Sequence, residues 1–167
     1  MTTPILIIIP GDPVGKGRAR SAVLYGKDKQ PLRDRKTGRI LTSHYTPAKT
    51  RTWEGIAKSL AMDAMKGRDP LLCPVRISII ITHGVADSWP NWKRELAYAG
   101  RIEPTVKPDA DNVEKAVKDA LNGVVWHDDC QVVSCSKEKL YGPVPGVRVL
   151  VTARETLPAQ VKHRPRG

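Results

Sequence analysis

Two pairs of aspartates are the residues of this chain best suited to chemistry. Asp109 and Asp111 come just before a helical pattern, and Asp128 and Asp129 come just after it. Clustered carboxylates repel one another unless a cation lies among them, and hard oxygen ligands suit Mg²⁺ or Mn²⁺. A helix between the two pairs can bring them back toward one another. The sequence therefore predicts a site for a divalent metal ion.

The first pair has two interpretations. In an extended segment, residues i and i+2 point to the same side, so Asp109 and Asp111 can both reach one metal ion. Alternatively, one aspartate caps the following helix and the other is solvated. The second pair, Asp128 and Asp129, favours the metal site over this simpler alternative.

Three further polar residues near these carboxylates also have alternative roles. Lys115 lies one turn after Asp111, where it forms an ordinary i,i+4 ion pair or stabilises negative charge that grows on a phosphate. Asp119 is expected to be a structural partner of Lys115 rather than a catalytic residue. His127 is either a proton carrier beside the aspartates or, as we favour, a histidine of a surface turn.

The rest of the chain is strongly basic. The formal net charge is +11 over 167 residues. Between Lys16 and Arg51, eleven lysines and arginines stand against two acidic residues, which gives this segment a net charge of +9. Such a cluster suits the binding of nucleic-acid phosphates. An acidic centre in a basic protein is what metal-dependent cleavage of a polyanion requires.

Hydrophobic patterns predict the elements that must position these residues. Strands are expected at residues 5–9, 75–82, 130–140 and 147–153, and helices at residues 48–66 and 111–121. Residues 88–101 fit either a short helix or a loop, and residues 103–108 are expected to be extended. Residues 16–46 are expected to form a long basic loop with room for a short hairpin, mobile without DNA.

The helix expected at 111–121 separates two kinds of side chain. Its apolar stripe comprises Val113, Ala116, Val117, Ala120 and Leu121. Its opposite face carries Asp111, Lys115 and Asp119. The pattern therefore predicts that the polar candidates point away from the core.

The order of elements predicts one α+β domain over residues 1–156, with a mixed β-sheet and two main helices. A basic, disordered tail is expected over residues 157–167. Cys73, Cys130 and Cys135 form no CxxC motif and are expected to be reduced thiols. No apolar run approaches the roughly 20 residues that a membrane span needs, and the N-terminus lacks a signal peptide. We expect a cytoplasmic protein with no membrane partner.

The centre of the chain also resembles a known family. The segment KPDADNVEKAVKDALNGVVWHDDCQV resembles the RusA family of Holliday junction resolvases, which are encoded mainly by bacteria, phages and prophages. The motif positions are Asp109, Asp111, Asn112, Lys115, Asp119-Ala120-Leu121, Trp126, Asp128-Asp129 and Gln131-Val132. The segments PGDPVGKGRAR, TPAKTRTWE and DSWPNWKR are similar to the phage-borne branch, and the resemblance covers most of residues 5–153.

The resemblance implies a RusA-like fold and a role for each acidic position. Asp109, Asp111 and Asp129 would be catalytic carboxylates that bind the metal, and Asp128 would be an adjacent acidic residue that also binds it. Lys115 would be the essential cation. The cofactor would be Mg²⁺, which Mn²⁺ can replace. The residues expected to bind DNA are Lys16, Arg18, Arg20, Lys49, Arg51, Lys93 and Arg94.

The activity implied by the resemblance is cleavage of four-way junction DNA. The protein would be a homodimer, of bacterial or phage origin, that makes paired symmetrical nicks in recombination and repair. The basic segment between Gly15 and Thr46 is longer than in compact members and can widen the substrate range. Two alternatives stay open: a non-catalytic, structure-selective DNA-binding protein, and a broader nuclease that acts on flaps or forks.

Overall fold

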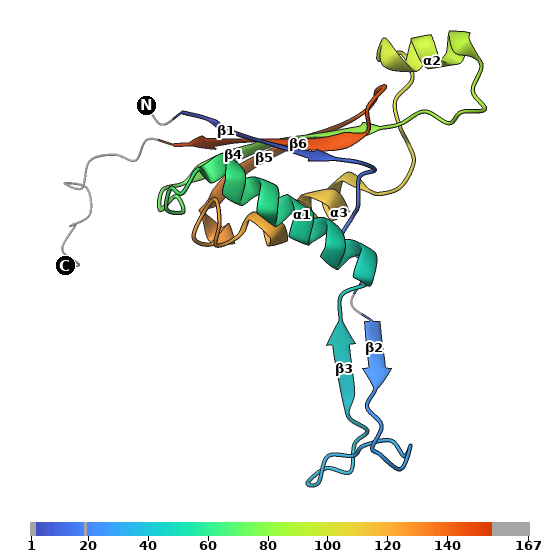
Figure 1. The fold of residues 1–167 in the computed structure, drawn as a ribbon, viewed down its shortest axis with the longest axis vertical. Helices are drawn as coiled ribbons and strands as arrows, with labels where there is room; N and C mark the ends of the chain where they lie inside the picture. Colours follow the sequence, from blue (N-terminus) through green and yellow to red (C-terminus); the bar gives the residue numbers. More distant parts are fainter. Residues whose placement is uncertain (1–2, 19, 155–167) are drawn as a thin grey trace, which may run out of the picture.

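A mixed β-sheet is the central layer of the protein. The computed structural model describes residues 3–18 and 20–154 (Figure 1). The sheet has the strand order β1-β6-β4-β5. Its strands are β1 (Ile5–Pro10), β4 (Val75–His83), β5 (Val132–Tyr141) and β6 (Gly146–Ala153). Strands β4 and β5 are parallel, and the other neighbours are antiparallel. The predicted α+β class with a mixed sheet is confirmed.

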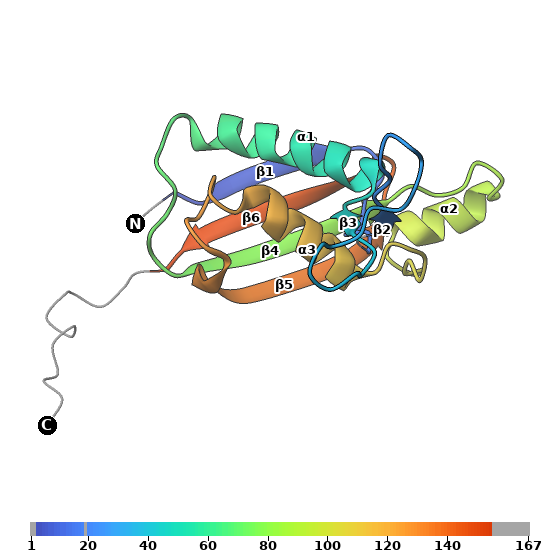
Figure 2. The same cartoon turned by 90° about the horizontal axis from the view of Figure 1, so that it is seen from below.

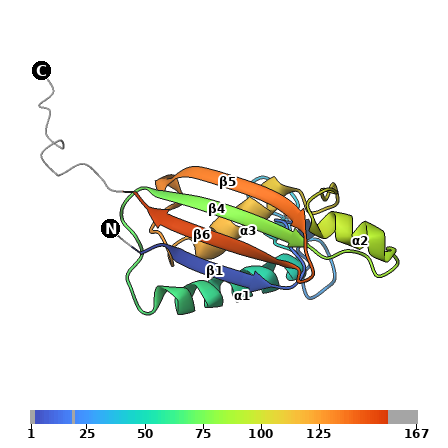
Figure 3. The ribbon, with the colours of Figure 1, turned by 90° about the horizontal axis from the view of Figure 1, so that it is seen from above.

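Period-two patterns decide which face of the sheet is buried. In β1, Ile5, Ile7 and Ile9 are buried, whereas Leu6 and Ile8 are exposed. Strands β4 and β6 alternate in the same way. Successive side chains of a strand point to opposite faces, and β-branched residues suit this half-buried position. The buried side chains meet the helices, while the opposite face of the sheet carries none of the labelled helices (Figure 3).

Helices α1 (Ala48–Met65) and α3 (Ala110–Leu121) cover one face of the sheet (Figure 2). Both were predicted, and the apolar stripe of α3 is buried as expected. Residues 88–101 contain a short helix, α2 (Asn91–Tyr98), which lies beyond one end of the sheet. Trp89 lies before this helix and makes an edge contact with Tyr141 at a centroid distance of 5.3 Å.

The basic segment contains a short antiparallel ribbon within the expected long loop. Strands β2 (Arg20–Val23) and β3 (Thr42–Tyr45) pair antiparallel, and the isolated bridges Tyr25–Pro31 and Arg33–Ile40 close two local turns further out. The Asp28 and Asp34 side chains accept hydrogen bonds from nearby backbone N–H groups and so shape two tight turns. The ribbon projects away from the sheet (Figure 1). The structure therefore contains the short hairpin that the sequence allowed, and the residues between its two strands are mainly turns and loop.

The expected tail over residues 157–167 lies outside the described residues, so the predicted domain boundary stays a prediction. In the part of the chain that the structure describes, no helix is long and apolar enough to cross a membrane.

Candidate active site

The first aspartate pair lies at the start of α3. Asp109 immediately precedes the helix, but its side chain makes no capping hydrogen bond to the backbone. It accepts instead a 3.4 Å hydrogen bond from Nδ2 of Asn112. The Asp111 side chain is 75% exposed and pairs through Oδ1 with Nζ of Lys137 on β5. Neither carboxylate is used as a helix cap, so both side chains stay exposed at the positive end of the helix, each with one oxygen in a contact with a neighbouring side chain.

Lys137 ties the start of α3 to strand β5. Its ammonium group contacts both Asp111 and Glu114, and Glu114 also accepts a 2.6 Å hydrogen bond from Lys118. Burial alone would raise the pKa of Glu114, but the hydrogen bonds from Lys118 and Lys137 outweigh it and lower the pKa to about 2. Hydrogen bonds to Asp111 and Glu114 raise the pKa of Lys137. This pairing could not be predicted from sequence patterns, because it joins positions far apart along the chain.

Asp111 and Asp119, the two expected ion-pair partners of Lys115, pair with other lysines in the structure. Lys115 is exposed and forms no ion pair with the described residues, since Asp111 pairs with Lys137. Asp119 pairs with Lys16 at 2.5 Å rather than with Lys115. Lys115 is thus available for another role on the polar face of α3, and its catalytic function stays a prediction.

The second aspartate pair lies in a turn held by its neighbours. The turn is a short 3₁₀ helix, η1 (Asp129–Gln131), at the start of β5. The Asp128 carboxylate accepts a 2.8 Å hydrogen bond from the Cys130 N–H, which lowers the pKa of Asp128. Oδ1 of Asp129 accepts a 2.9 Å hydrogen bond from Nε1 of Trp126. Both carboxylates therefore have a fixed orientation.

Two motif residues anchor this turn to the core. The Trp126 side chain is fully buried while its N–H reaches Asp129. The Gln131 side chain donates to the carbonyl oxygens of Leu71 and Cys73 at 2.8 and 2.9 Å, and accepts from the Asp128 N–H. Trp126 and Gln131 act as supports for the aspartates, a role that sequence reasoning missed.

The two aspartate pairs lie apart within one chain. Helix α3 has 12 residues and spans about 18 Å between them. Strand β5 turns back along α3, so Lys137 rather than Asp129 reaches the helix start. Among the described residues, no three His, Cys, Asp or Glu side chains are placed to hold one metal ion. The expected cluster of both pairs is therefore not formed within a single chain, because the rigid helix separates them.

Asp109 and Asp111 nevertheless suit Mg²⁺. Their carboxylate oxygens are exposed and are not taken up by helix capping. Mg²⁺ is commonly held by one or two carboxylates together with water and substrate phosphates, rather than by a cage of protein ligands. Asp109 and Asp111 fit this mode of binding without the second aspartate pair.

The N-terminal loop packs closely against the start of α3. The Lys16 N–H donates to the Asn112 carbonyl oxygen at 2.7 Å. A Cβ atom at Gly15 would lie 2.9 Å from the Cβ of Asn112 and 3.0 Å from that of Pro108, so only glycine permits this approach. The segment PGDPVGKG therefore contributes to the architecture of the site.

Lys16 links α1 and α3. Its ammonium group contacts Glu54 at 2.7 Å and Asp119 at 2.5 Å. Burial opposes the charge of Lys16, but the hydrogen bonds to Asp119 and Glu54 outweigh it and raise the pKa of this residue. Lys16 thus has structural partners already, and its expected contact with DNA stays a prediction.

The other predicted DNA-binding residues lie on separate elements. Arg18, Lys49 and Arg51 are exposed near the base of the ribbon and the start of α1. The side chain of Arg20 lies outside the described part. Near α2, the Lys93 ammonium lies 3.9 Å from the centroid of the Trp89 ring, and Arg94 donates to the carbonyl oxygens of Trp89 and Asp87.

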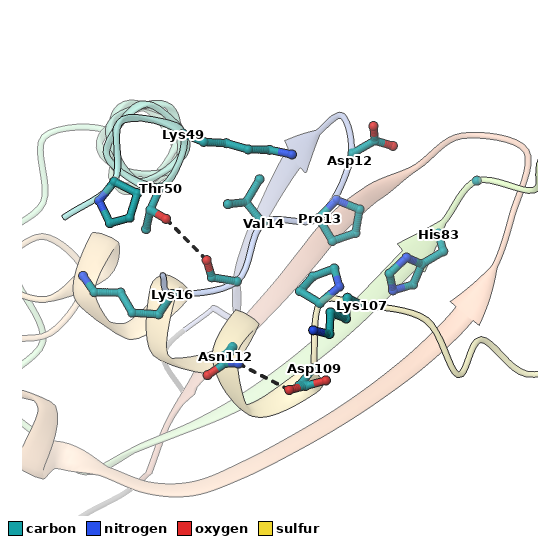
Figure 4. Close-up of a pocket in the computed structure, with 14 residues that line it drawn as sticks. Asp12, Pro13, Val14, Lys16, Lys49, Thr50, His83, Lys107, Asp109 and Asn112 are labelled. Carbon is teal, nitrogen blue, oxygen red and sulfur yellow. Dashed lines mark hydrogen bonds between the residues drawn. The ribbon is translucent and has the colours of Figure 1, made fainter. Parts of the chain in front are cut away.

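A cavity of about 640 Å³ opens beside Asp109 (Figure 4). It lies between the N-terminal loop, the start of α1, the end of β4 and the segment before α3. Its polar lining includes Asp12, Lys49, His83, Lys107, Asp109 and Asn112. Cations and carboxylates thus meet at the same opening, next to the first aspartate pair.

Accessible carboxylates beside a basic cavity, on a small α+β domain with a basic ribbon, are features of an enzyme that cleaves nucleic acid. Comparison with known proteins agrees with this class. Residues 10–152 match the family described as Endodeoxyribonuclease RusA, and the chain belongs to this family. It is also 32% identical over 151 residues to the uncharacterized protein YqaN of Bacillus subtilis (strain 168). The matched region covers 88% of this chain and 94% of that protein. The predicted family, one of endodeoxyribonucleases, is confirmed.

Proposed function

We propose that this protein is a metal-dependent endonuclease that resolves four-way DNA junctions by paired symmetrical nicks, in recombination and repair. The family match places the chain among endodeoxyribonucleases. One observation supports metal-dependent cleavage in particular. At the start of α3, Asp109 and Asp111 are exposed beside a cavity lined by Lys49 and Lys107. Carboxylates for a metal and cations for DNA phosphates then lie on one surface.

The residues of the chain have distinct roles in this proposal. Asp109 and Asp111 would hold Mg²⁺ or Mn²⁺, with Asp128 and Asp129 as the further carboxylates. When bound, the ion polarises a phosphoryl oxygen and supplies a hydroxide at neutral pH. The Lys115 ammonium, free of ion pairs with the described residues, stabilises the negative charge that develops during cleavage. No nucleophile from the protein is required.

A homodimer is the second part of the proposal. A four-way junction offers two equivalent strands, and a two-fold dimer presents two matched sites. Within one chain, about 18 Å of helix separates Asp111 from the second pair. A second copy of the chain can bring its own Asp129 to the first pair, so dimerisation would complete the set of carboxylates as well as pair the nicks.

The projecting ribbon favours a second candidate, a broader nuclease that also cuts flaps and forks. Its exposed lysines and arginines add a phosphate-binding surface that does not depend on the junction centre. The two candidates share the same active site and differ only in substrate selection.

Cleavage of synthetic DNA tests both candidates. A four-way junction, a fork, a flap and a linear duplex would each be incubated with the protein and Mg²⁺, and with EDTA as the control. We expect symmetrical nicks in opposite strands of the junction, dependent on the metal. Equal cutting of forks and flaps would favour the broader nuclease. Tight junction binding without cleavage in Mg²⁺ or Mn²⁺ would contradict both and leave a DNA-binding protein.

A further inference from the structure

His83, the last residue of β4, has an unused hydrogen-bonding group. Its side chain is buried, with only 7% exposed, and its Nε2 atom has no hydrogen-bond partner among the described residues. Buried polar atoms in native proteins nearly always have a partner. The Nε1 atom of Trp53 also lacks one, but Trp53 does not line the cavity beside Asp109, whereas His83 does. The imidazole is therefore placed to meet a ligand in that cavity.

The surroundings of His83 favour a neutral ring. Burial and the nearby charge of Lys139 lower its pKa, and Asp12 opposes them only in part. A neutral imidazole carries one N–H donor and one acceptor nitrogen. With the proton on Nε2, the ring donates a hydrogen bond to an oxygen atom in the cavity.

Two lysines make the cavity suited to an anion. Lys49 and Lys107 both line it, and neither forms an ion pair with the described residues, unlike Lys16 nearby. In Figure 4 the Lys49 side chain extends across the cavity toward the loop that carries Asp12. Unpaired lysine ammonium groups are common ligands of phosphate.

The remaining lining fits a phosphate together with its sugar, as in one unit of a DNA strand. The volume of about 640 Å³ lies within the usual range for sites of small ligands, about 300–1,000 Å³. Pro13, Pro47 and Pro108 supply apolar walls that can contact a sugar. The carboxylates of Asp12 and Asp109 also line the cavity and weaken the binding of a free phosphate, so inorganic phosphate should bind there less tightly than a DNA strand does.

We propose that this cavity binds a phosphate of the DNA strand next to the cleaved bond, through Lys49, Lys107 and the Nε2–H group of His83. The inference rests on the proposed nuclease function and adds a positioning site to it. His83 then fixes the strand so that the adjacent phosphodiester lies at Asp109 and Asp111.

Inorganic phosphate is the first probe. The full-length protein without metal would be titrated with phosphate while the imidazole signals are followed by NMR. The chain has 4 histidines, and the His83 signal is assigned from its loss in His83→Gln. We expect a saturable shift of the His83 signal alone. Lys49→Ala and Lys107→Ala should each weaken phosphate binding several-fold, whereas Lys58→Ala, at an exposed position of the same helix as Lys49, should not.

Junction cleavage is the second measurement. His83→Leu should lower cleavage about tenfold, because it removes one hydrogen bond to the substrate. His83→Gln should restore most of the activity, because its amide can donate in place of Nε2–H. Thermal unfolding of both variants separates loss of binding from loss of folding. In salt titrations of junction binding, each lysine variant should lower the slope by about 0.7 to 0.9, and His83→Leu should leave it unchanged.

The two proposals can fail separately. If the wild type cuts junctions while phosphate leaves the His83 signal unmoved and folded His83→Leu cuts normally, the positioning site is wrong and the nuclease stands. A weak, non-saturable shift of every histidine signal would also overturn the positioning site, because the phosphate would then be an adventitious ion only. If the wild type cuts no DNA but phosphate binds with the expected lysine dependence, the cavity stands as a phosphate site and the nuclease fails.

Discussion

At the scale of single residues, the two aspartate pairs differ in how the chain holds them. Asp109 and Asp111 are exposed and contact the polar side chains of Asn112 and Lys137, whereas Asp129 accepts a hydrogen bond from the indole N–H of the buried Trp126. Hydrogen-bond partners of this kind orient the carboxylates that bind a metal ion. In the proposal, the motif thus contains both metal ligands and the residues that hold them in place.

Asp111→Asn should abolish cleavage and retain junction binding. The substitution removes one negative charge from the proposed metal site but leaves the basic surface unchanged. Cleavage and electrophoretic binding assays with a four-way junction measure the two properties separately. Retention of more than about a tenth of wild-type cleavage, roughly 1.4 kcal/mol of barrier, would contradict the role of Asp111. Thermal unfolding shows whether losing the contact with Lys137 also affects the fold.

Trp126→Phe should reduce cleavage about tenfold and lower the free energy of unfolding by about 1 kcal/mol, because it removes the hydrogen bond to Asp129. Trp53→Phe is the matched control, since Trp53 is also buried but its Nε1 has no partner among the described residues. Denaturant unfolding and junction cleavage would be measured for both. Equal loss of cleavage in the two variants would mean that ring volume, not the orientation of Asp129, matters.

At the scale of elements, periodic segments were predicted and long-range pairings were not. The stripe of α3 and the alternation in β1 and β4 depend only on neighbouring residues, so the sequence reveals them. The contacts of Lys137 with Asp111, of Lys16 with Asp119 and of Gln131 with Leu71 join distant positions. No local pattern carries that information, and for the same reason the separation of the two aspartate pairs was missed.

The stability of the protein should depend on pH through Glu114, which connects α3 to β5. Its pKa falls from the ordinary value of 4.5 to about 2 in the folded protein, so its stabilising effect is complete above pH 4.5 and is lost as the pH falls toward 2. Glu114→Gln should therefore be less stable than the wild type at pH 6, and the difference should shrink in acid. Denaturant unfolding across this range measures it. A difference that is constant with pH would show that the carboxylate charge is unimportant.

The β2–β3 ribbon should supply much of the DNA affinity. It belongs to the segment that holds +9 of the net charge of +11. Each lost phosphate contact should lower the slope of log affinity against log salt by about 0.9 on duplex DNA. Changing the exposed residues Lys27, Arg35 and Lys36 to Ala should therefore flatten the slope and weaken junction and duplex binding alike. If only junction binding fell while the slope held, the ribbon would read junction shape instead.

At the scale of the whole molecule, one chain does not bring together the four carboxylates proposed for the site. The start of α3 and the turn at Asp129 lie at opposite ends of a rigid helix, and a fixed helix length cannot be shortened by side-chain movement. The composition and charge of the chain predict DNA as the partner, but they do not encode where a second copy binds. The proposed pairing of two copies is thus the part of the site least accessible from sequence.

The proposed homodimer should share its active sites between the two copies. Light scattering should show twice the chain mass of 18.4 kDa, and an active monomer would contradict the proposal. Asp111→Asn and Asp129→Asn should each be inactive alone. When the two variants are mixed and allowed to exchange chains, a shared arrangement regenerates one intact site per heterodimer, because the unchanged Asp129 of one copy meets the unchanged Asp109 and Asp111 of the other. Single nicks in the junction should then appear. If each site came from one chain, every site in the mixture would stay defective and no nicks would form.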